Sequence, residues 1–302
     1  MKILVASSSH LAINLLGHLK KSDHKLLGSI SSPDRPTGRG QSIRSNNFAS
    51  YCQEVGVTCY KPDTNEELAG ILRKTQAEVV ITLAYGRLIK TNELEIPKHG
   101  WLNVHFSLLP RWRGAAPVQR AIAAGDEQSG VTVFKLEQGL DTGPIYTTLS
   151  YPLNDGSRSD DVLNHLASLC IQPVSHALSM IEGGKLATAQ NSEGVTLAPK
   201  ILKSEGRIDW SRSAVEIDRQ IRAFHAWPCA YTSFAGTRIG VMQARVSERE
   251  GVAGEVVSLN PLLVGCGSGS LEILRVKPEN KREMSSSDWL RGARIALPCA
   301  FE

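Results

Sequence analysis

The 302-residue chain lacks several features that would direct it to a particular class of protein. No apolar run approaches the roughly 18 residues that a membrane-spanning helix needs, so we expect no membrane partner. The opening strand-like run is too short, and turns polar too quickly, to be a signal peptide. The six cysteines contain no C-x-x-C pair, which predicts reduced thiols in a cytoplasmic protein and argues against a zinc site or a disulfide framework.

Two chemical motifs are missing as well. There is no G-x-G-x-x-G after the first expected strand, so we predict no dinucleotide cofactor. There is no G-x-S-x-G, so we expect no activated serine nucleophile. The formal net charge of +4 and the pI of about 8.7 permit a polyanionic partner without requiring one.

The chain does carry the pattern of an α/β protein with a second, smaller β domain. Over residues 2–151, short apolar strands alternate with helices, which predicts a Rossmann-like, doubly wound and mostly parallel sheet. A long amphipathic helix over 160–182, bent or restarted near Pro173, closes this domain. Farther on, a helix and several short strands separated by glycine turns predict an OB-like β-barrel. We therefore expect a first domain over 1–183, a linker over 184–205 and a barrel over 206–302.

The clearest candidate site begins in the apolar strand expected at 100–106. Asn103 and His105 alternate with bulky residues there, so both side chains leave the same face of the strand. An amide and an imidazole held side by side can donate hydrogen bonds to an oxygen that becomes negative during a reaction. Taken alone, the pair could equally be a buried asparagine and histidine that are satisfied by backbone groups.

Asp141 could supply a third group to this pair. It lies between two glycines, after the strand expected at 131–136, and its carboxylate could orient or charge the imidazole. By itself, an aspartate between glycines is usually a turn residue. A His-Asp pair can also mark a metal site, but such a site needs three or four ligands. No third ligand adjoins the pair in sequence, so we expect no metal.

Two loops are expected to form the walls of a single cleft. The loop 84–89 follows the strand expected at 78–83, and the loop 107–110 follows His105. Ligands of open α/β sheets bind at the carboxyl ends of the strands, where both loops lie. An apolar loop in this place can also be ordinary packing.

The stretch 32–44 is rich in arginine, glycine and proline and has little apolar material. It cannot form a core element, so we expect an exposed, flexible and basic loop. Composition alone leaves open whether such a loop binds a partner or is merely solvated.

Taken together, Asn-x-His, Ser-Leu-Leu-Pro followed by Arg-x-x-Gly, and Gly-Leu-Asp-Thr-Gly-Pro resemble the 10-formyltetrahydrofolate-dependent formyltransferases. Ile-Arg-Ala-Phe with Trp-Pro, and Arg-Ile-Asp-Trp, extend the resemblance over essentially the whole chain. It implies formyl transfer from 10-formyltetrahydrofolate as co-substrate, with Asn103, His105 and Asp141 as catalytic residues. It also implies folate binding by eight residues of the two loops: Tyr85, Gly86, Leu88, Ile89, Ser107, Leu108, Leu109 and Pro110.

Arg-Pro-x-Gly-Arg-Gly in the basic stretch resembles an insertion found in the branch of the family that formylates methionyl-tRNA for translation initiation. The resemblance implies that Arg35, Arg39 and Arg44 contact the acceptor end of the initiator tRNA. We expect the chain to act as a monomer. Two alternatives stay open: a formyltransferase that acts on a nucleotide-linked amino sugar, and a non-catalytic RNA-binding protein with a degenerate enzyme domain.

The chain departs from the family in two places. Ser7, Ser8 and Ser9 stand where relatives usually have Gly-Thr-Pro, and these serines could cap the helix that follows. Phe106 stands where a glycine is usual. A bulky ring beside the expected catalytic histidine could narrow the cleft.

Overall fold

The computed structural model describes residues 1–37 and 41–302, which divide into two compact units. Unit 1 consists of Met1–Pro117, Ser129–Pro152 and Leu163–Ala198, and unit 2 of Val118–Gln128, Leu153–Val162 and Pro199–Glu302. Two short segments that precede Leu163 in the sequence therefore belong to the second unit. None of the helices in the described residues combines the length and the apolar character needed to cross a bilayer.

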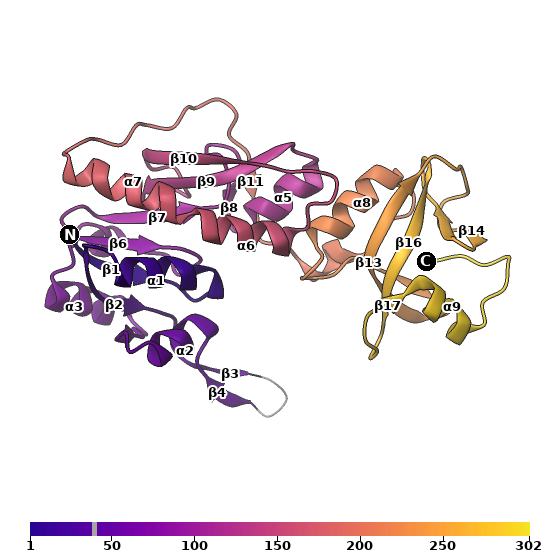
Figure 1. The fold of residues 1–302 in the computed structure, drawn as a ribbon, viewed down its shortest axis with the longest axis horizontal. Helices are drawn as coiled ribbons and strands as arrows, with labels where there is room; N and C mark the ends of the chain where they lie inside the picture. Colours follow the sequence, from indigo (N-terminus) through magenta and orange to yellow (C-terminus); the bar gives the residue numbers. More distant parts are fainter. Residues whose placement is uncertain (38–40) are drawn as a thin grey trace. The chain divides into compact units, whose positions relative to one another are not determined.

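Unit 1 is built on a seven-stranded sheet with the order β10-β9-β7-β6-β1-β2-β5 (Figure 1). All neighbours from β5 to β7 pair in parallel, and β9 runs antiparallel to β7. The chain steps outward from β1 in both directions, so the predicted doubly wound, mostly parallel sheet is confirmed. Its strands are β1 (Lys2–Ala6), β2 (Lys25–Ile30), β5 (Cys59–Tyr60), β6 (Val79–Thr82), β7 (Trp101–His105), β9 (Gln128–Lys135) and β10 (Ile145–Pro152).

Polar side chains cap the N-termini of several helical segments of unit 1. Ser9 accepts a hydrogen bond from the backbone N–H of Leu11 at 3.3 Å and so caps the 3-10 turn that leads into α1, whereas α1 itself begins after Ala12 without a side-chain cap. Asn46 and Thr64 cap α2 and α3 in the same way. The helices are α1 (Ile13–Lys20), α2 (Asn47–Glu54), α3 (Asn65–Thr75), α4 (Thr91–Leu94) and α7 (Ile171–Glu182), and α6 (Ser159–Leu169) begins in unit 2 and ends in unit 1.

The long helix expected at 160–182 is two helices, α6 and α7, which divide at Cys170. The helix therefore restarts, as one of the two predicted outcomes had it, three residues before Pro173. Pro173 occupies the first turn of α7, where its missing N–H removes no helical hydrogen bond.

The basic stretch, expected to be an exposed, flexible and basic loop, is exposed at its described ends, which pair as a small antiparallel hairpin, β3 (Arg35–Thr37) and β4 (Ser42–Arg44) (Figure 1). Lys61 joins the two ends of this hairpin. Its ammonium lies 2.6 Å from a carboxylate oxygen of Asp34, before β3, and 2.9 Å from the hydroxyl of Ser45, after β4. An isolated two-stranded hairpin is marginally stable, so a clamp at its base stabilises it.

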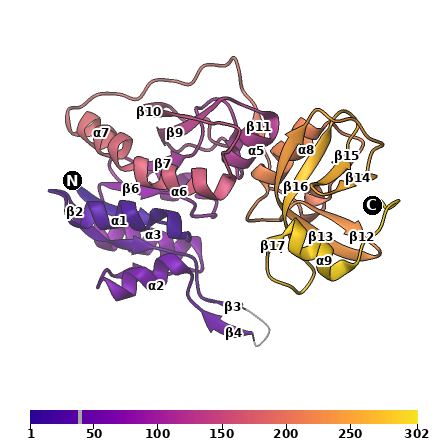
Figure 2. The ribbon, with the colours of Figure 1, turned by 45° about the vertical axis from the view of Figure 1, so that its right-hand side comes forward.

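Unit 2 contains a six-stranded antiparallel sheet in which β12, β13, β16, β15 and β14 follow one another and β17 pairs with β16 (Figure 2). Register shifts in the long β13 bend it, as bulges do, and the sheet curls into a half-barrel that agrees with the predicted OB-like architecture. The strands are β12 (Tyr231–Phe234), β13 (Thr237–Ser247), β14 (Val256–Leu259), β15 (Leu262–Gly265), β16 (Ser270–Pro278) and β17 (Met284–Ser285).

The core of unit 2 is a cluster of buried residues that all lie between Ile208 and Phe301. At one side, Trp289 packs against Phe234 and Phe301 with ring centroids 5.6 and 5.9 Å apart. Trp289 belongs to α9 (Ser286–Ala293). The second helix that contributes to this core is α8 (Ala214–Ala223). Unit 2 also contains most of α5 (Pro117–Ala124), which comes from the first half of the chain.

Candidate active site

The candidate site lies at the carboxyl end of β7. Asn103 is half-buried there, opposite Thr82 of β6 and Phe134 of β9. Among the residues that the structure describes, its side-chain amide has no hydrogen-bond partner. The amide is therefore held by a rigid strand while its N–H groups are free to donate to a ligand.

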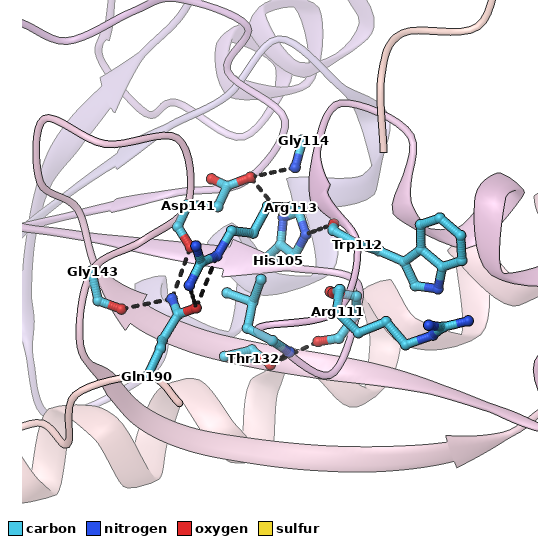
Figure 3. Close-up of polar contacts among 11 residues, drawn as sticks. His105, Arg111, Trp112, Arg113, Gly114, Thr132, Asp141, Gly143 and Gln190 are labelled. Atoms are coloured by element: carbon cyan, nitrogen blue, oxygen red, sulfur yellow. Dashed lines mark hydrogen bonds and ion pairs between the residues drawn. The ribbon is translucent and has the colours of Figure 1, made fainter. Parts of the chain in front are cut away.

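His105, two residues farther along the same strand, is buried, with 5% of its surface exposed. Its Nε2 lies 2.8 Å from the carbonyl oxygen of Trp112 (Figure 3). A carbonyl oxygen can only accept, so Nε2 carries a proton and donates it. The other ring nitrogen, Nδ1, lies 3.7 Å from Oδ2 of Asp141.

Burial lowers the pKa of His105 from its ordinary value of 6.5, while the charge of Asp141 and the hydrogen bond to Trp112 oppose this effect only in part. At neutral pH the ring is therefore uncharged. Because Nε2 carries the one proton of the neutral ring, Nδ1 has a free lone pair on the side of Asp141. This nitrogen can take up a proton, and the carboxylate beside it would stabilise the resulting imidazolium.

The loop that carries Asp141 is held in an uncommon backbone conformation. Asp141 has a positive φ of 49°, and its Oδ2 accepts the backbone N–H of Gly114 at 2.8 Å. Gly114 has φ of 128°, and a Cβ at this position would lie 2.5 Å from the carbonyl oxygen of Ala198. A Cβ on Gly143 would collide with the carbonyl oxygen of Lys135. Glycines are thus required where the backbone segments of this site approach one another.

The loop after β7 is fixed by its own hydrogen bonds. Ser107, which is buried, donates its hydroxyl to the carbonyl of Arg111 at 2.6 Å. Thr132 of β9 donates to the carbonyl of Ser107 at 2.7 Å and accepts the N–H of Leu109 at 3.2 Å. Of the other loop residues expected to bind folate, Leu109 is buried, whereas Leu108 and Pro110 are half-buried. Phe106, at the start of this loop, is also buried.

The loop 84–89 divides the other four residues expected to bind folate. Tyr85 and Ile89 are buried in the hydrophobic core of unit 1. Gly86 has φ of 74° and open space around it, and Leu88 is 82% exposed. Of these four residues, Leu88 and the backbone at Gly86 are therefore accessible to a ligand, while the buried side chains of Tyr85 and Ile89 anchor the loop in the core.

The arginines expected to contact tRNA belong to the β3–β4 hairpin. Arg35 and Arg44 lie opposite each other across the hairpin, and both are exposed. Arg44 donates from Nε to the hydroxyl of Ser42 at 2.9 Å. Arg39 lies outside the described residues.

Gln190 also belongs to the site, although no sequence pattern predicted it. It lies in the segment expected to be a linker, yet its side chain bonds to the Asp141 loop and to Arg113. Nearby, the hydroxyl of Thr196 accepts the N–H of Trp112 at 2.8 Å, and β11 (Leu197–Ala198) pairs with β8 (Arg113–Gly114). Residues up to Ala198 are thus bound to unit 1. No periodicity or motif in this polar segment distinguishes these residues.

A hollow of about 650 Å³ adjoins the Asp141 loop and is lined in part by Arg113, Thr142, Gln190 and Val195. Within the described ranges, no group of three or more His, Cys, Asp or Glu side chains is placed to hold a metal ion. What the site offers chemically is a free amide, an imidazole with one open nitrogen, and a carboxylate. This set suits proton movement and the stabilisation of an oxyanion.

Comparison with known proteins gives a consistent result. Residues 1–175 match the family model described as "Formyl transferase", and residues 200–294 match "Formyl transferase, C-terminal domain". A protein of Streptomyces griseus named "Methionyl-tRNA formyltransferase" is 40% identical over 98% of this chain and 98% of its own. A protein of Magnetococcus marinus with the same name is 36% identical over 96% of this chain and 95% of its own.

A solved structure of similar fold is the N-formyltransferase of Helicobacter canadensis in complex with folinic acid and dTDP-3-aminofucose. It has a TM-score of 0.68 and 19% sequence identity, and the match covers 90% of this chain and 97% of that one. At this identity the likeness shows a shared fold and does not determine the acceptor.

Proposed function

The chain belongs to the formyl transferase family, and from that premise we propose that it transfers the formyl group of 10-formyltetrahydrofolate to the free amino group of methionyl-tRNA. The observation that carries the proposal is the grouping of Asn103, His105 and Asp141. An unpartnered amide and a neutral imidazole leave the same face of β7, and the carboxylate lies 3.7 Å from the open ring nitrogen. Acyl transfer to an amine needs these groups and no covalent enzyme intermediate.

The proposed reaction begins when the amine of the methionyl group attacks the formyl carbon. The new C–N bond forms, and the carbonyl electrons move to the formyl oxygen, which becomes negative. Asn103 would donate an amide N–H to this oxyanion. Nδ1 of His105 would take the proton that the amine loses, because burial keeps the ring neutral and that nitrogen unprotonated.

The imidazolium formed in this way would lie beside the negative Asp141, which stabilises it. Its Nδ1–H can then serve as a second donor to the oxyanion. Collapse of the tetrahedral intermediate breaks the bond to N10 of the folate. The proton passes from His105 to that nitrogen, and tetrahydrofolate leaves. The only other proton on the ring stays on Nε2, bound to the carbonyl of Trp112.

The folate is proposed to lie between the two loops at the carboxyl ends of β6 and β7. Support comes from the exposed Leu88, the open backbone at Gly86 and the rigid, half-buried turn around Leu108 and Pro110. Tyr85, Ile89, Ser107 and Leu109 would act there as supports for the walls.

The choice of tRNA over an amino sugar depends on two observations. The relatives named for methionyl-tRNA are 36–40% identical over nearly the whole chain, whereas the sugar enzyme of similar fold is 19% identical. The exposed arginines of the β3–β4 hairpin offer charge to a phosphate backbone, which a small sugar nucleotide does not need. The hairpin, including Arg39, is therefore proposed as the contact to the acceptor end.

We place the enzyme in the cytoplasm, where translation begins, and its six free thiols are compatible with a reducing compartment. That it acts as a monomer stays a prediction, which light scattering of the purified chain tests. Residues 1–183 are proposed as the catalytic domain and 206–302 as the barrel domain.

Acceptor identity is tested by product analysis. The purified chain is given 10-formyltetrahydrofolate with initiator methionyl-tRNA, with a mixture of nucleotide-linked amino sugars, or with uncharged tRNA as control. We expect formylation of methionyl-tRNA alone. A formylated sugar with no formylated methionine would favour the sugar enzyme, and tRNA binding without any formylation would favour the non-catalytic alternative.

A further inference from the structure

The side chain of Gln190 connects two backbone segments of the active site, β8 and the Asp141 loop. Its Nε2 donates to the carbonyl oxygen of Asp141 at 2.7 Å and to that of Gly143 at 2.8 Å (Figure 3). Its Oε1 accepts from Nε and a terminal nitrogen of Arg113 at 3.1 and 2.6 Å. A glutamine amide has two N–H donors and two acceptor lone pairs, so every one of them is used here.

This pattern determines which way the amide points. The two carbonyls can only accept and the guanidinium can only donate, so a flipped amide would lose all four contacts. The contacts also come from opposite directions. Arg113 belongs to β8, whose next residue, Gly114, holds the carboxylate of Asp141, while the two carbonyls belong to the Asp141 loop itself.

The Asp141 loop needs such an anchor. Asp141 has a left-handed backbone conformation, which a residue with a side chain adopts only when its surroundings stabilise it. The two carbonyls bound by Gln190 belong to this strained residue and to the glycine two positions later. The backbone N–H of Gly114 binds the side-chain carboxylate of Asp141, and the amide of Gln190 binds its backbone carbonyl. Loss of either contact leaves the carboxylate free to rotate away from His105.

We propose that Gln190 is a positioning residue that holds the Asp141 carboxylate beside His105 during formyl transfer. It touches no reacting atom and acts by fixing the backbone of the Asp141 loop against Arg113. The inference rests on the proposed function for its effect on catalysis, whereas its structural part concerns only the distance between Asp141 and His105.

Two substitutions separate the contacts of Gln190. Gln190→Met keeps the length of the side chain and removes all four hydrogen bonds. Gln190→Glu keeps an acceptor for Arg113 but replaces the N–H donors with a carboxylate that would face two carbonyl oxygens. Glu193→Gln, an exposed position three residues away that does not line the hollow, is the matched control. Thermal unfolding establishes that each variant is folded, and the glutamate variant serves if the methionine variant is not.

Steady-state formylation with saturating folate is the first readout. We expect kcat to fall by roughly 10- to 10²-fold in both Gln190 variants, as misplacement of a catalytic group by about 1 Å does. KM for methionyl-tRNA should change little, and Glu193→Gln should behave as the wild type. A glutamate variant with normal kcat would overturn the proposal, because the contact to Arg113 alone would then be sufficient.

The second readout is the titration of His105 by NMR in the intact chain. Asp141 is the charged group, among the described residues, that raises the pKa of His105 against the effect of burial. If Gln190→Met releases Asp141, the pKa of His105 should fall further. An unchanged titration together with unchanged kcat would overturn the proposal.

Different results would contradict the positioning role of Gln190 and the proposed function. If the wild type formylates methionyl-tRNA while the Gln190 variants match it in rate and titration, the positioning role is wrong and the function stands. If the wild type does not formylate methionyl-tRNA, the function is wrong. The titration of His105 in Gln190→Met then still decides whether Gln190 holds Asp141 in place.

Discussion

At the scale of single residues, His105 has two nitrogens with different tasks. Nε2 is committed to the carbonyl of Trp112, so only Nδ1 can change its protonation during a reaction. That nitrogen lies 3.7 Å from Oδ2 of Asp141. At this distance the carboxylate can move closer when the ring becomes charged. Asn103 is a simpler group, since it contributes one preorganised donor from a rigid strand.

Asn103→Ala tests that donor. We expect kcat to fall about 10²–10³-fold, because one donor to the developing oxyanion is removed from a site that excludes much of the water. Folding should be preserved, since the amide makes no hydrogen bond within the described chain. Steady-state kinetics and thermal unfolding measure both effects. A folded variant with near-normal turnover would remove Asn103 from the mechanism.

The lowered pKa of His105 has a consequence for stability. Between the folded pKa and the ordinary value of 6.5, the unfolded chain binds a proton at this residue and the folded chain does not. Acid therefore favours the unfolded state, and the contribution of His105 to the free energy of unfolding, present above pH 6.5, is lost as the pH falls below it. Urea unfolding at pH 7.5 and 5.5 should show a smaller decrease for His105→Gln than for the wild type. An equal decrease would show that His105 titrates alike in both states.

Which of these residues the sequence could predict depends on how they are brought together. Asn103 and His105 share a face because strand side chains alternate, so their spacing was enough. The approach of Asp141 was predicted from a family resemblance, and the structure adds the distance. Gln190 reaches the site from 49 residues beyond Asp141, in a segment without periodic structure, and no local rule places it there.

At the scale of elements, the β3–β4 hairpin depends on a residue outside it. Lys61 follows β5 and binds Asp34 and Ser45 at the two ends of the hairpin. The same ammonium lowers the pKa of the Asp34 carboxyl, so the ion pair persists at neutral pH. Composition excluded a core element here but could not exclude a hairpin, which requires only backbone pairing and an anchored base.

Lys61→Met should loosen the hairpin without disturbing the folate loops. We expect kcat/KM for methionyl-tRNA to fall while the Kd of folate stays unchanged, because the arginines of the hairpin would no longer be held in position. Lys74→Met, at an exposed position on α3, is the matched control for lost charge. Steady-state kinetics and folate titration distinguish the two substrates. Equal kcat/KM in all three proteins would mean that the clamp has no part in binding tRNA.

The break between α6 and α7 shows a second limit of sequence patterns. The amphipathic period over 160–182 predicted one long helix, bent or restarted near Pro173, and proline was the only visible cause of either. The chain restarts at Cys170, and Pro173 lies in the first turn of the new helix. A residue tolerated in a first turn does not itself determine where the previous helix ends.

At the scale of the whole molecule, the two units do not follow a single cut in the chain. Val118–Gln128 and Leu153–Val162 belong to unit 2, where Arg120 pairs with Glu205 at 2.5 Å and Asp160 lies 3.1 Å from Nδ1 of His225. Local patterns predicted the order of the two folds along the chain. They could not show that two segments preceding Leu163 join the second unit.

The fragment 206–302 should nevertheless fold by itself, because its hydrophobic core lies entirely within residues 208–301. It lacks Asp160 and Arg120, so its stability should be lower than that of a fragment that keeps those partners. Near-UV circular dichroism and a cooperative thermal transition are the measurements. A fragment without fixed tertiary structure would show that Val118–Gln128 and Leu153–Val162 are essential to the barrel.

The central claim is that one formyl group passes from folate to the methionyl amine. A single-turnover reaction tests it, with the chain in excess over methionyl-tRNA and 10-formyltetrahydrofolate labelled in its formyl carbon. Mass spectrometry then follows the amino acid released from the tRNA. We expect the label to appear in N-formylmethionine in step with the release of tetrahydrofolate, and to appear much more slowly with Asp141→Asn, whose amide keeps the shape and loses the charge. Label that stays on the folate, or that is released only as formate, would contradict the claim.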